Sequence, residues 1–148
     1  MFDRTIALIG QDNLDKIESK HILIIGVGGV GGYAIEALIR SGIHNITLVD
    51  YDNIDISNIN RQIIAKESNA GKLKVEAWKE RINEINSSVL VNTLPLKIDE
   101  NNIDILFKSS YDYIIDACDT VIVKKLLIKK CHEKNIKLIT VCGMGKKL

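Results

Sequence analysis

Short apolar runs separated by longer amphipathic stretches set the pattern of this 148-residue chain. Residues 21–27 (HILIIGV) form a continuous apolar run, which is typical of a strand covered on both faces. Residues 45–50 (NITLVD) predict a second strand, and residues 89–94, 111–117 and 137–142 predict three further short strands.

Between these runs, apolar positions recur at helical spacing. Residues 28–42, 71–85 and 121 to about 134 each predict an amphipathic helix, and one more helix is expected before residue 20. Strands that alternate with helices imply right-handed crossovers and a parallel sheet. The predicted fold class is therefore α/β: a Rossmann-like, doubly wound, mostly parallel sheet with helices on both faces, in one domain that spans residues 1–148.

Chemically distinctive residues follow the predicted strands. Gly26–Gly31, Asp50–Asp52, Asp116–Asp119 and Cys142–Gly145 all stand where a strand ends. Ligands of such sheets lie beyond the carboxyl ends of the strands. We therefore expect these four groups to meet at one edge of the sheet.

The first group, GVGGVG, fits the pattern G-x-G-x-x-G between a strand and a helix. Its glycines let the backbone approach phosphates, and the helix N-terminus offers unpaired amide donors. Asp50 follows Gly26 by 24 residues, where a carboxylate can accept hydrogen bonds from ribose hydroxyls. The loop predicts an adenine nucleotide and, taken alone, favours NAD over ATP.

The polar run at residues 57–62 (SNINRQ) has no use in a nicotinamide domain. A triphosphate, in contrast, requires its charges to be neutralised and a metal ion to be held. Arg61 offers a forked donor for phosphate oxygens, and Lys74 offers a point charge near a helix start. The hydrogen-bonding candidates without charge are Asn58, Asn60 and Gln62.

Asp119 follows a predicted strand and could hold Mg²⁺ through a carboxylate oxygen. Each of these residues also has an ordinary structural interpretation. Lys74 could be a solvated helix lysine, Asn58 a cap, and Asp119 the N-cap of the following helix. Their order along the chain and their place at strand ends favour the functional interpretation.

Together the motifs GVGGVG, VDYDNIDISNINRQ, GKLKVE and DACDT resemble the ThiF/MoeB/HesA superfamily, relatives of the ubiquitin-activating enzymes. The resemblance runs from Arg4 to Leu148. It implies binding of ATP with Mg²⁺ and adenylation of a carboxylate. The opening DRTIALIGQDNLDKI and the closing TVCGMGKKL are similar to the branch of tRNA threonylcarbamoyladenosine dehydratases.

The resemblance also assigns roles to particular residues. It implies that Gly26, Gly28 and Gly29 form the nucleotide loop and that Asp50, with Asp52 nearby, recognises the ribose. It assigns phosphate contacts to Asn58, Arg61 and Lys74. It also implies that Arg61, Lys74 and Asp119 are catalytic, with Asp119 the magnesium ligand. It places an arginine that reaches the triphosphate of a partner subunit at Arg4. The full set of expected nucleotide-binding residues is Arg4, Gly26, Gly28, Gly29, Asp50, Asp52, Asn58, Asn60, Arg61, Gln62, Lys74 and Asp119.

The implied reaction is the ATP-dependent dehydration and cyclisation of N6-threonylcarbamoyladenosine in tRNA. In it the threonyl carboxylate attacks the α-phosphate, pyrophosphate leaves, and the neighbouring ureido group closes a ring and expels AMP. Two alternatives remain open at this point: adenylation of the C-terminus of a ubiquitin-like sulfur carrier, and an NAD(P)-binding oxidoreductase domain. The resemblance further implies a homodimer and allows a sulfur-transfer protein as a partner.

The sequence departs from the family pattern in three respects. Gly32 stands where relatives often have serine, and Lys146 where asparagine is usual. Family members also continue well beyond the position that matches Leu148. The substrate-side half, with any zinc or catalytic cysteines, is therefore not expected in this chain, and turnover is expected to need it.

Composition bears on the cellular compartment and on how charge is distributed along the chain. No apolar run approaches the roughly 18 residues of a membrane span, and no signal sequence opens the chain, so the cytoplasm is expected and a membrane is not. Net charge is +1, but residues 121–148 carry eight lysines against Glu133. This asymmetry points to a polyanion such as tRNA or, alternatively, to a solvated helix face. Cys118, Cys131 and Cys142 form no motif, so each is expected to be a small buried residue.

Overall fold

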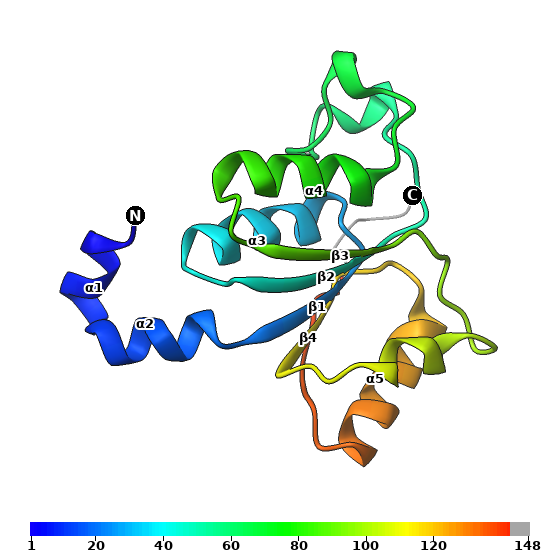
Figure 1. The fold of residues 1–148 in the computed structure, drawn as a ribbon. Coiled ribbons are helices and arrows are strands. Elements are labelled where there is room, and N and C mark those ends of the chain that lie inside the picture. Colours follow the sequence, from blue (N-terminus) through cyan, green and yellow to red (C-terminus); the bar gives the residue numbers. More distant parts are fainter. Residues whose placement is uncertain (143–148) are drawn as a thin grey trace.

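A five-stranded parallel sheet forms the centre of the computed structural model, which describes residues 1–142 (Figure 1). Every neighbouring pair of strands is parallel, and the strand order is β3-β2-β1-β4-β5. The strands are β1 (His21–Ile25), β2 (Asn45–Val49), β3 (Leu90–Leu94), β4 (Tyr113–Asp116) and β5 (Lys137–Thr140). The predicted Rossmann-like fold class is confirmed.

Helices cover both faces of the sheet. In the view of Figure 1, α3 and α4 lie above the strands, and α5 and the short helix η3 lie below. Two cores result because successive side chains of a strand point to opposite faces. Ile22 and Ile24 of β1 join the core under α3 and α4, whereas Leu23 and Ile25 join the core over α5. The helices are α1 (Asp3–Ile9), α2 (Gln11–Glu18), α3 (Gly29–Arg40), α4 (Lys74–Ile85) and α5 (Val121–Glu133), with 3₁₀ helices η1 (Ile56–Asn58), η2 (Glu67–Asn69) and η3 (Ile103–Lys108).

Burial differs between the middle and the edges of the sheet. β1, β2 and β4 are buried over nearly all of their length. The edge strands β3 and β5 are intermediate or exposed throughout, because each has a neighbouring strand on one side alone. The expectation of a strand covered on both faces therefore holds for β1, and the sequence did not distinguish the buried central strands from the exposed edge strands.

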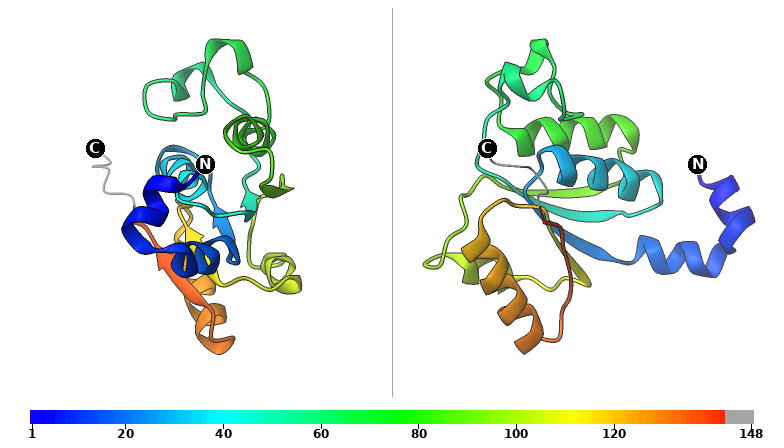
Figure 2. Two further views of the ribbon diagram at one scale, coloured as in Figure 1. Left: turned by 60° about the vertical axis from the view of Figure 1, so that its left-hand side comes forward. Right: turned by 180° about the vertical axis from the view of Figure 1, so that it is seen from behind.

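The single N-terminal helix expected from the sequence is two helices. Gly10 separates α1 from α2 and adopts a φ of 80°, which an L side chain rarely tolerates. α1 buries none of its residues and projects away from the sheet (Figure 2). α1 therefore contributes nothing to the two cores, whereas Ile17 of α2 packs against the core under α3 and α4.

The point where the strand order reverses lies between β1 and β4. The chain crosses to opposite faces of the sheet from these two strands, so their carboxyl ends diverge and leave a crevice. The glycine loop and the predicted groups at Asp50 and Asp116 all follow strands at this edge. Cys142 lies two residues beyond β5, whereas Gly143–Gly145 and Lys146 lie outside the described residues.

A partly buried pair of charges joins α4 to α3. Arg81 donates hydrogen bonds of 2.8 and 3.0 Å to the two oxygens of Glu36, and Arg40 donates to the same carboxylate. Burial alone would raise the pKa of Glu36, but the hydrogen bonds and charges of the two arginines hold it below its usual range. Since α4 begins at Lys74, this clamp also positions a predicted site residue.

Candidate functional site

A cavity of about 330 Å³ opens at the carboxyl ends of β1, β2 and β4. Nine of the twelve predicted nucleotide-binding residues line it: Gly26, Gly28, Asp50, Asp52, Asn58, Arg61, Gln62, Lys74 and Asp119. Gly29, Asn60 and Arg4 do not. Three of the four predicted groups at strand ends therefore meet at this edge of the sheet, whereas Cys142 of the fourth group does not line the cavity.

The glycine loop is built so closely that its key positions admit no side chain. Gly26 has a φ of 83°, and a Cβ there would lie 2.7 Å from the carbonyl oxygen of Ala117. A Cβ on Gly31 would lie 1.8 Å from the carbonyl oxygen of Gly26. Gly28 faces the amide of Gln62, and Gly29 begins α3 just outside the cavity wall. The loop thus brings bare backbone to the cavity, as phosphate binding requires.

Asp50 has a structural role that the sequence did not reveal. One of its carboxylate oxygens accepts a 2.9 Å hydrogen bond from the backbone N–H of Val27, and the other accepts one of 2.9 Å from that of Asp52. Asp50 therefore ties the end of β2 to the glycine loop. Each oxygen still has a lone pair for a ligand hydroxyl.

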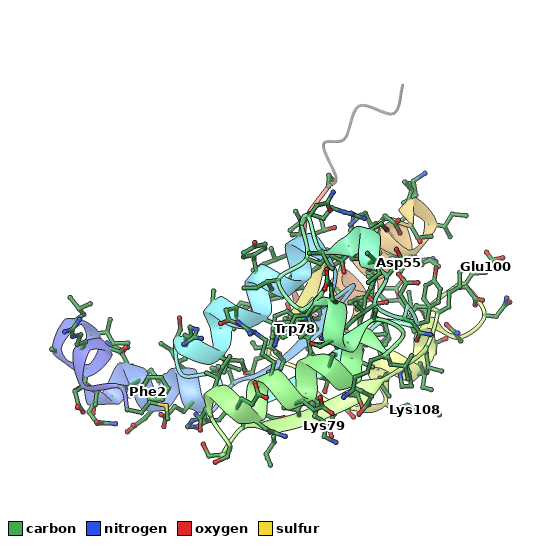
Figure 3. The ribbon with its side chains drawn as sticks, turned by 90° about the horizontal axis from the view of Figure 1, so that it is seen from above. Phe2, Asp55, Trp78, Lys79, Glu100 and Lys108 are labelled. Atoms are coloured by element: carbon green, nitrogen blue, oxygen red, sulfur yellow. The ribbon has the colours of Figure 1, made fainter. Side chains whose placement is uncertain are left out.

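Trp78 braces the same loop from beneath, and sequence reasoning missed it. Its indole N–H donates a 3.0 Å hydrogen bond to the carbonyl oxygen of Val27, and the side chain is fully buried between α4 and α3 (Figure 3). A Cβ on Gly32 would lie 2.9 Å from the Trp78 ring, so the tryptophan occupies the space that a side chain at Gly32 would need. The available signal was the spacing, since Trp78 lies one helical turn after Lys74 on the same face.

The polar run folds into a tight turn around η1. Asn58 is buried, and its side-chain oxygen accepts a 3.1 Å hydrogen bond from the backbone N–H of Asp55, which in turn caps η1 by accepting from Ser57. The structural interpretation of Asn58 as a cap is correct for its oxygen. Asn58 also lines the cavity, so its roles as a cap and as a candidate ligand contact are compatible.

Arg61 stands at the cavity without a carboxylate partner in the described part of the chain. Its guanidinium donates to the carbonyl oxygen of Ser57 and to the side-chain oxygen of Asn60, both at 2.8 Å. Asn60 therefore supports Arg61 instead of lining the cavity. The neighbouring Gln62 is buried, and its side-chain oxygen has no hydrogen-bond partner among residues 1–142.

Lys74 is buried, so its interpretation as a solvated helix lysine is wrong. Its side chain is 6% exposed, and its ammonium group lies 2.9 Å from Asp52 Oδ2. A lysine is rarely buried to this extent. It is also the first residue of α4, where the positive end of the helix dipole disfavours a cation. Packing and helix electrostatics therefore both disfavour the position, and an anionic ligand would compensate.

Asp119 lies exposed at the cavity rim and does not cap α5. The N-cap is Thr120, whose hydroxyl lies 3.5 Å from Asp119 Oδ1. Within residues 1–142, no cluster of three or more acidic, histidine or cysteine side chains could hold a metal ion. Any divalent cation at Asp119 would therefore depend on ligand oxygens and water for the rest of its coordination.

Sequence reasoning also missed a buried network beside the cavity. The Asp116 carboxylate is fully buried and accepts hydrogen bonds from Lys124 (3.1 Å) and Thr140 (2.5 Å). The Lys124 ammonium also donates to the carbonyl oxygen of Val141 at 2.8 Å. This network joins β4, α5 and the end of β5. An aspartate at the end of an apolar strand was its only sequence signal.

The three cysteines are free thiols in different environments. Cys131 is buried as expected, Cys118 is half-buried, and Cys142 is exposed, which corrects the expectation for the last of them. Burial, reinforced by the Asp116 carboxylate, raises the pKa of the cavity-lining Cys118 to about 11. Its thiol therefore stays protonated at neutral pH and is a poor nucleophile.

Most lysines of the C-terminal segment have local partners. Among the six in the described part, Lys124, Lys129 and Lys130 pair with acids, and Lys134 and Lys137 lie over aromatic rings, which leaves Lys125. Lys146 and Lys147 lie outside that part. The observed contacts favour a solvated helix face over a dedicated polyanion surface on α5.

Arg4 lies far from the cavity of its own chain. It lines a separate hollow with Ile39, Arg40 and Ile85. In Figure 3 its neighbour Phe2 lies toward the N-terminal end of the molecule, well away from the polar-loop residue Asp55. Arg4 could therefore serve a nucleotide site only in another copy of the chain.

These features define a Rossmann-like α/β domain with a polar, glycine-lined cavity at its switch point. The chain belongs to the ThiF family, whose profile matches residues 2–147. It is 43% identical over 138 residues to a tRNA threonylcarbamoyladenosine dehydratase of Haemophilus influenzae. It is 29% identical over 141 residues to a molybdopterin-synthase adenylyltransferase of the same organism.

The fold also matches that of a relative of known structure. The crystal structure of Escherichia coli tRNA N6-threonylcarbamoyladenosine dehydratase in complex with ATP superimposes with a TM-score of 0.94 at 39% identity. That comparison covers 99% of this chain and 60% of the other. The two curated relatives cover 93% and 94% of this chain, which spans 53% and 58% of their lengths. The chain therefore spans just over half of the length of these two relatives.

Proposed function

We propose that residues 1–148 form the ATP-binding adenylation domain of a tRNA threonylcarbamoyladenosine dehydratase. The observation that carries the proposal is the buried Lys74 beside the bare glycine loop. Arg61, which has no carboxylate partner in the described residues, adds a second cation at the same cavity. The dehydratase of Escherichia coli that matches this fold was solved with ATP. The greater identity to the dehydratase than to the molybdopterin-synthase adenylyltransferase favours the tRNA substrate.

The residues present fit a triphosphate. Loop amides at Gly26–Gly29, Arg61 and Lys74 can neutralise phosphate oxygens, and the unpaired buried oxygen of Gln62 can accept from a ligand hydroxyl. Asp119 would hold Mg²⁺, which neutralises phosphate charge when it is bound. In adenylation, Arg61 and Lys74 would bind and orient the phosphates and stabilise the charge that develops as pyrophosphate leaves.

We predict that the chain binds ATP with Mg²⁺ more tightly than NAD or NADP. Arg61 and Lys74 have more phosphate charge to neutralise in a triphosphate than in the diphosphate bridge of a dinucleotide. Isothermal titration calorimetry of the 148-residue chain with each ligand makes the comparison. Tighter binding of NAD would overturn the assignment and restore the oxidoreductase alternative.

The identity of the substrate that is adenylated is tested by measuring pyrophosphate release. With ATP present, bulk tRNA that carries N6-threonylcarbamoyladenosine is expected to stimulate release by the full-length protein, and a ubiquitin-like sulfur carrier is not. tRNA that lacks this modification is the matched control. Stimulation by the sulfur carrier alone would establish the rival function and sink the dehydratase assignment.

The chain is further proposed to act as a cytoplasmic two-fold dimer, with a sulfur-transfer protein as a secondary partner. The exposed helix α1 and the distance of Arg4 from its own cavity support an arrangement in which Arg4 reaches a neighbouring copy. Light scattering at micromolar concentration that showed monomers alone would contradict it.

None of the helices in the described residues is both long and apolar enough to cross a membrane.

A further inference from the structure

The ion pair between Asp52 and Lys74 is set by the main chain. Asn53 and Leu73 form an antiparallel bridge, and the backbone N–H of Lys74 donates a 3.0 Å hydrogen bond to the carbonyl oxygen of Asp52. These contacts bring the two segments together, and the side chains meet at 2.9 Å as a result. The pair is therefore a feature of the folded cavity and not a chance contact of two surface side chains.

The two partners differ in their freedom to move. The Lys74 side chain is 6% exposed, whereas that of Asp52 is 46% exposed. The carboxylate can therefore turn into water, but the ammonium cannot. The ammonium has three N–H groups and uses one of them on Asp52, so it keeps donors for a ligand in the cavity that Lys74 lines.

Charges around the cavity balance before any ligand binds. Three carboxylates and three cations of the described residues line it: Asp50, Asp52 and Asp119 against Arg61, Lys74 and Lys97. Asp50 holds backbone N–H groups through both of its oxygens, and Asp119 is the proposed magnesium ligand. Asp52 has no side-chain partner among residues 1–142 except Lys74. A polyphosphate that reaches Lys74 would therefore meet Asp52 as a competing anion.

We propose that Asp52 is a counter-ion that a triphosphate displaces from Lys74, rather than a contact for ribose. In the free cavity Asp52 compensates the buried ammonium. When a triphosphate binds, Lys74 donates to phosphate oxygens and the carboxylate turns to solvent. The pair then sets a threshold, because ligands with little phosphate charge fail to displace Asp52. This inference rests on the proposed binding of ATP and specifies how the cavity selects for it.

The test is titration calorimetry of Asp52→Asn in the 148-residue chain. ATP and inorganic tripolyphosphate are expected to bind about tenfold tighter than to the wild type, since the loss of one close charge pair is worth about that much. Adenosine should bind unchanged. Asp12→Asn, on the exposed surface of α2, is the matched control and should leave all three affinities as they were.

The same substitution made in a Lys74→Met variant separates displacement of Asp52 from Lys74 from a general repulsion between Asp52 and the phosphates. With Lys74→Met, Asp52→Asn should lose most of its effect on ATP, because no ammonium remains to be released. Unchanged or weaker ATP binding by Asp52→Asn would overturn the inference, as would a tenfold gain that persists beside Lys74→Met. Asp52→Ser replaces Asp52→Asn if the latter fails to fold. Failure of the wild type to bind ATP would instead overturn the proposed function along with this inference.

Discussion

Replacing Lys74 with alanine is expected to lower the rate of pyrophosphate release at saturating ATP by about 10²- to 10³-fold, the usual loss when a donor to developing oxyanion charge is removed. The buried ammonium is held at the cavity by its place at the start of α4. Asp50→Ala should instead mainly weaken ATP binding, because a ribose contact changes little between ground and transition states. Steady-state kinetics of the full-length protein separate the two effects.

Lys72 provides the matched control for this experiment. It lies two residues before Lys74, and its ammonium pairs with the exposed Glu80 rather than facing the cavity. Lys72→Ala should therefore leave turnover near that of the wild type. Near-normal turnover of Lys74→Ala at saturating ATP would remove Lys74 from the catalytic residues. Its burial would then need a purely structural explanation.

The fold and most of the site could be predicted because both depend on local signals. A glycine loop between a strand and a helix, and polar residues directly after apolar runs, have their positions fixed by the strand that precedes them. The nine predicted residues that line the cavity all lie on the segments that follow β1, β2 or β4. Periodicity was enough to place these elements, but it could not say which strands form the edges of the sheet.

What could not be predicted depends on tertiary neighbours. Nothing in the sequence shows that Lys74 is buried, since an isolated lysine at a helix start is usually solvated. Trp78 beneath the glycine loop looks like an ordinary core residue until its hydrogen bond to Val27 is seen. The role of Asp50 as an acceptor for Val27 is hidden for the same reason. Each of these contacts joins segments that are separated by more than 20 residues in the chain.

The Asp116–Lys124 pair gives the largest stability effect expected in the described part of the chain. Asp116 is fully buried, and the Lys124 side chain is 12% exposed, so water cannot compensate either charge. Asp116→Asn removes the carboxylate charge and leaves the ammonium uncompensated. Breaking a buried pair in this way typically lowers the free energy of unfolding by about 3 kcal/mol or more. That loss is a large fraction of the 5–15 kcal/mol of a typical domain, on the order of a fifth or more.

Urea unfolding at pH 7 measures this effect, with Asp104→Asn as the control. Asp104 also pairs with a lysine of α5, Lys130, but its side chain is 78% exposed. Its loss should therefore change the free energy of unfolding by less than about 1 kcal/mol. Combining Asp116→Asn with Lys124→Met should recover part of the lost stability, because the buried charge is removed with its partner. A loss for Asp116→Asn as small as that for Asp104→Asn would show that the network orients the end of β4 without stabilising the fold.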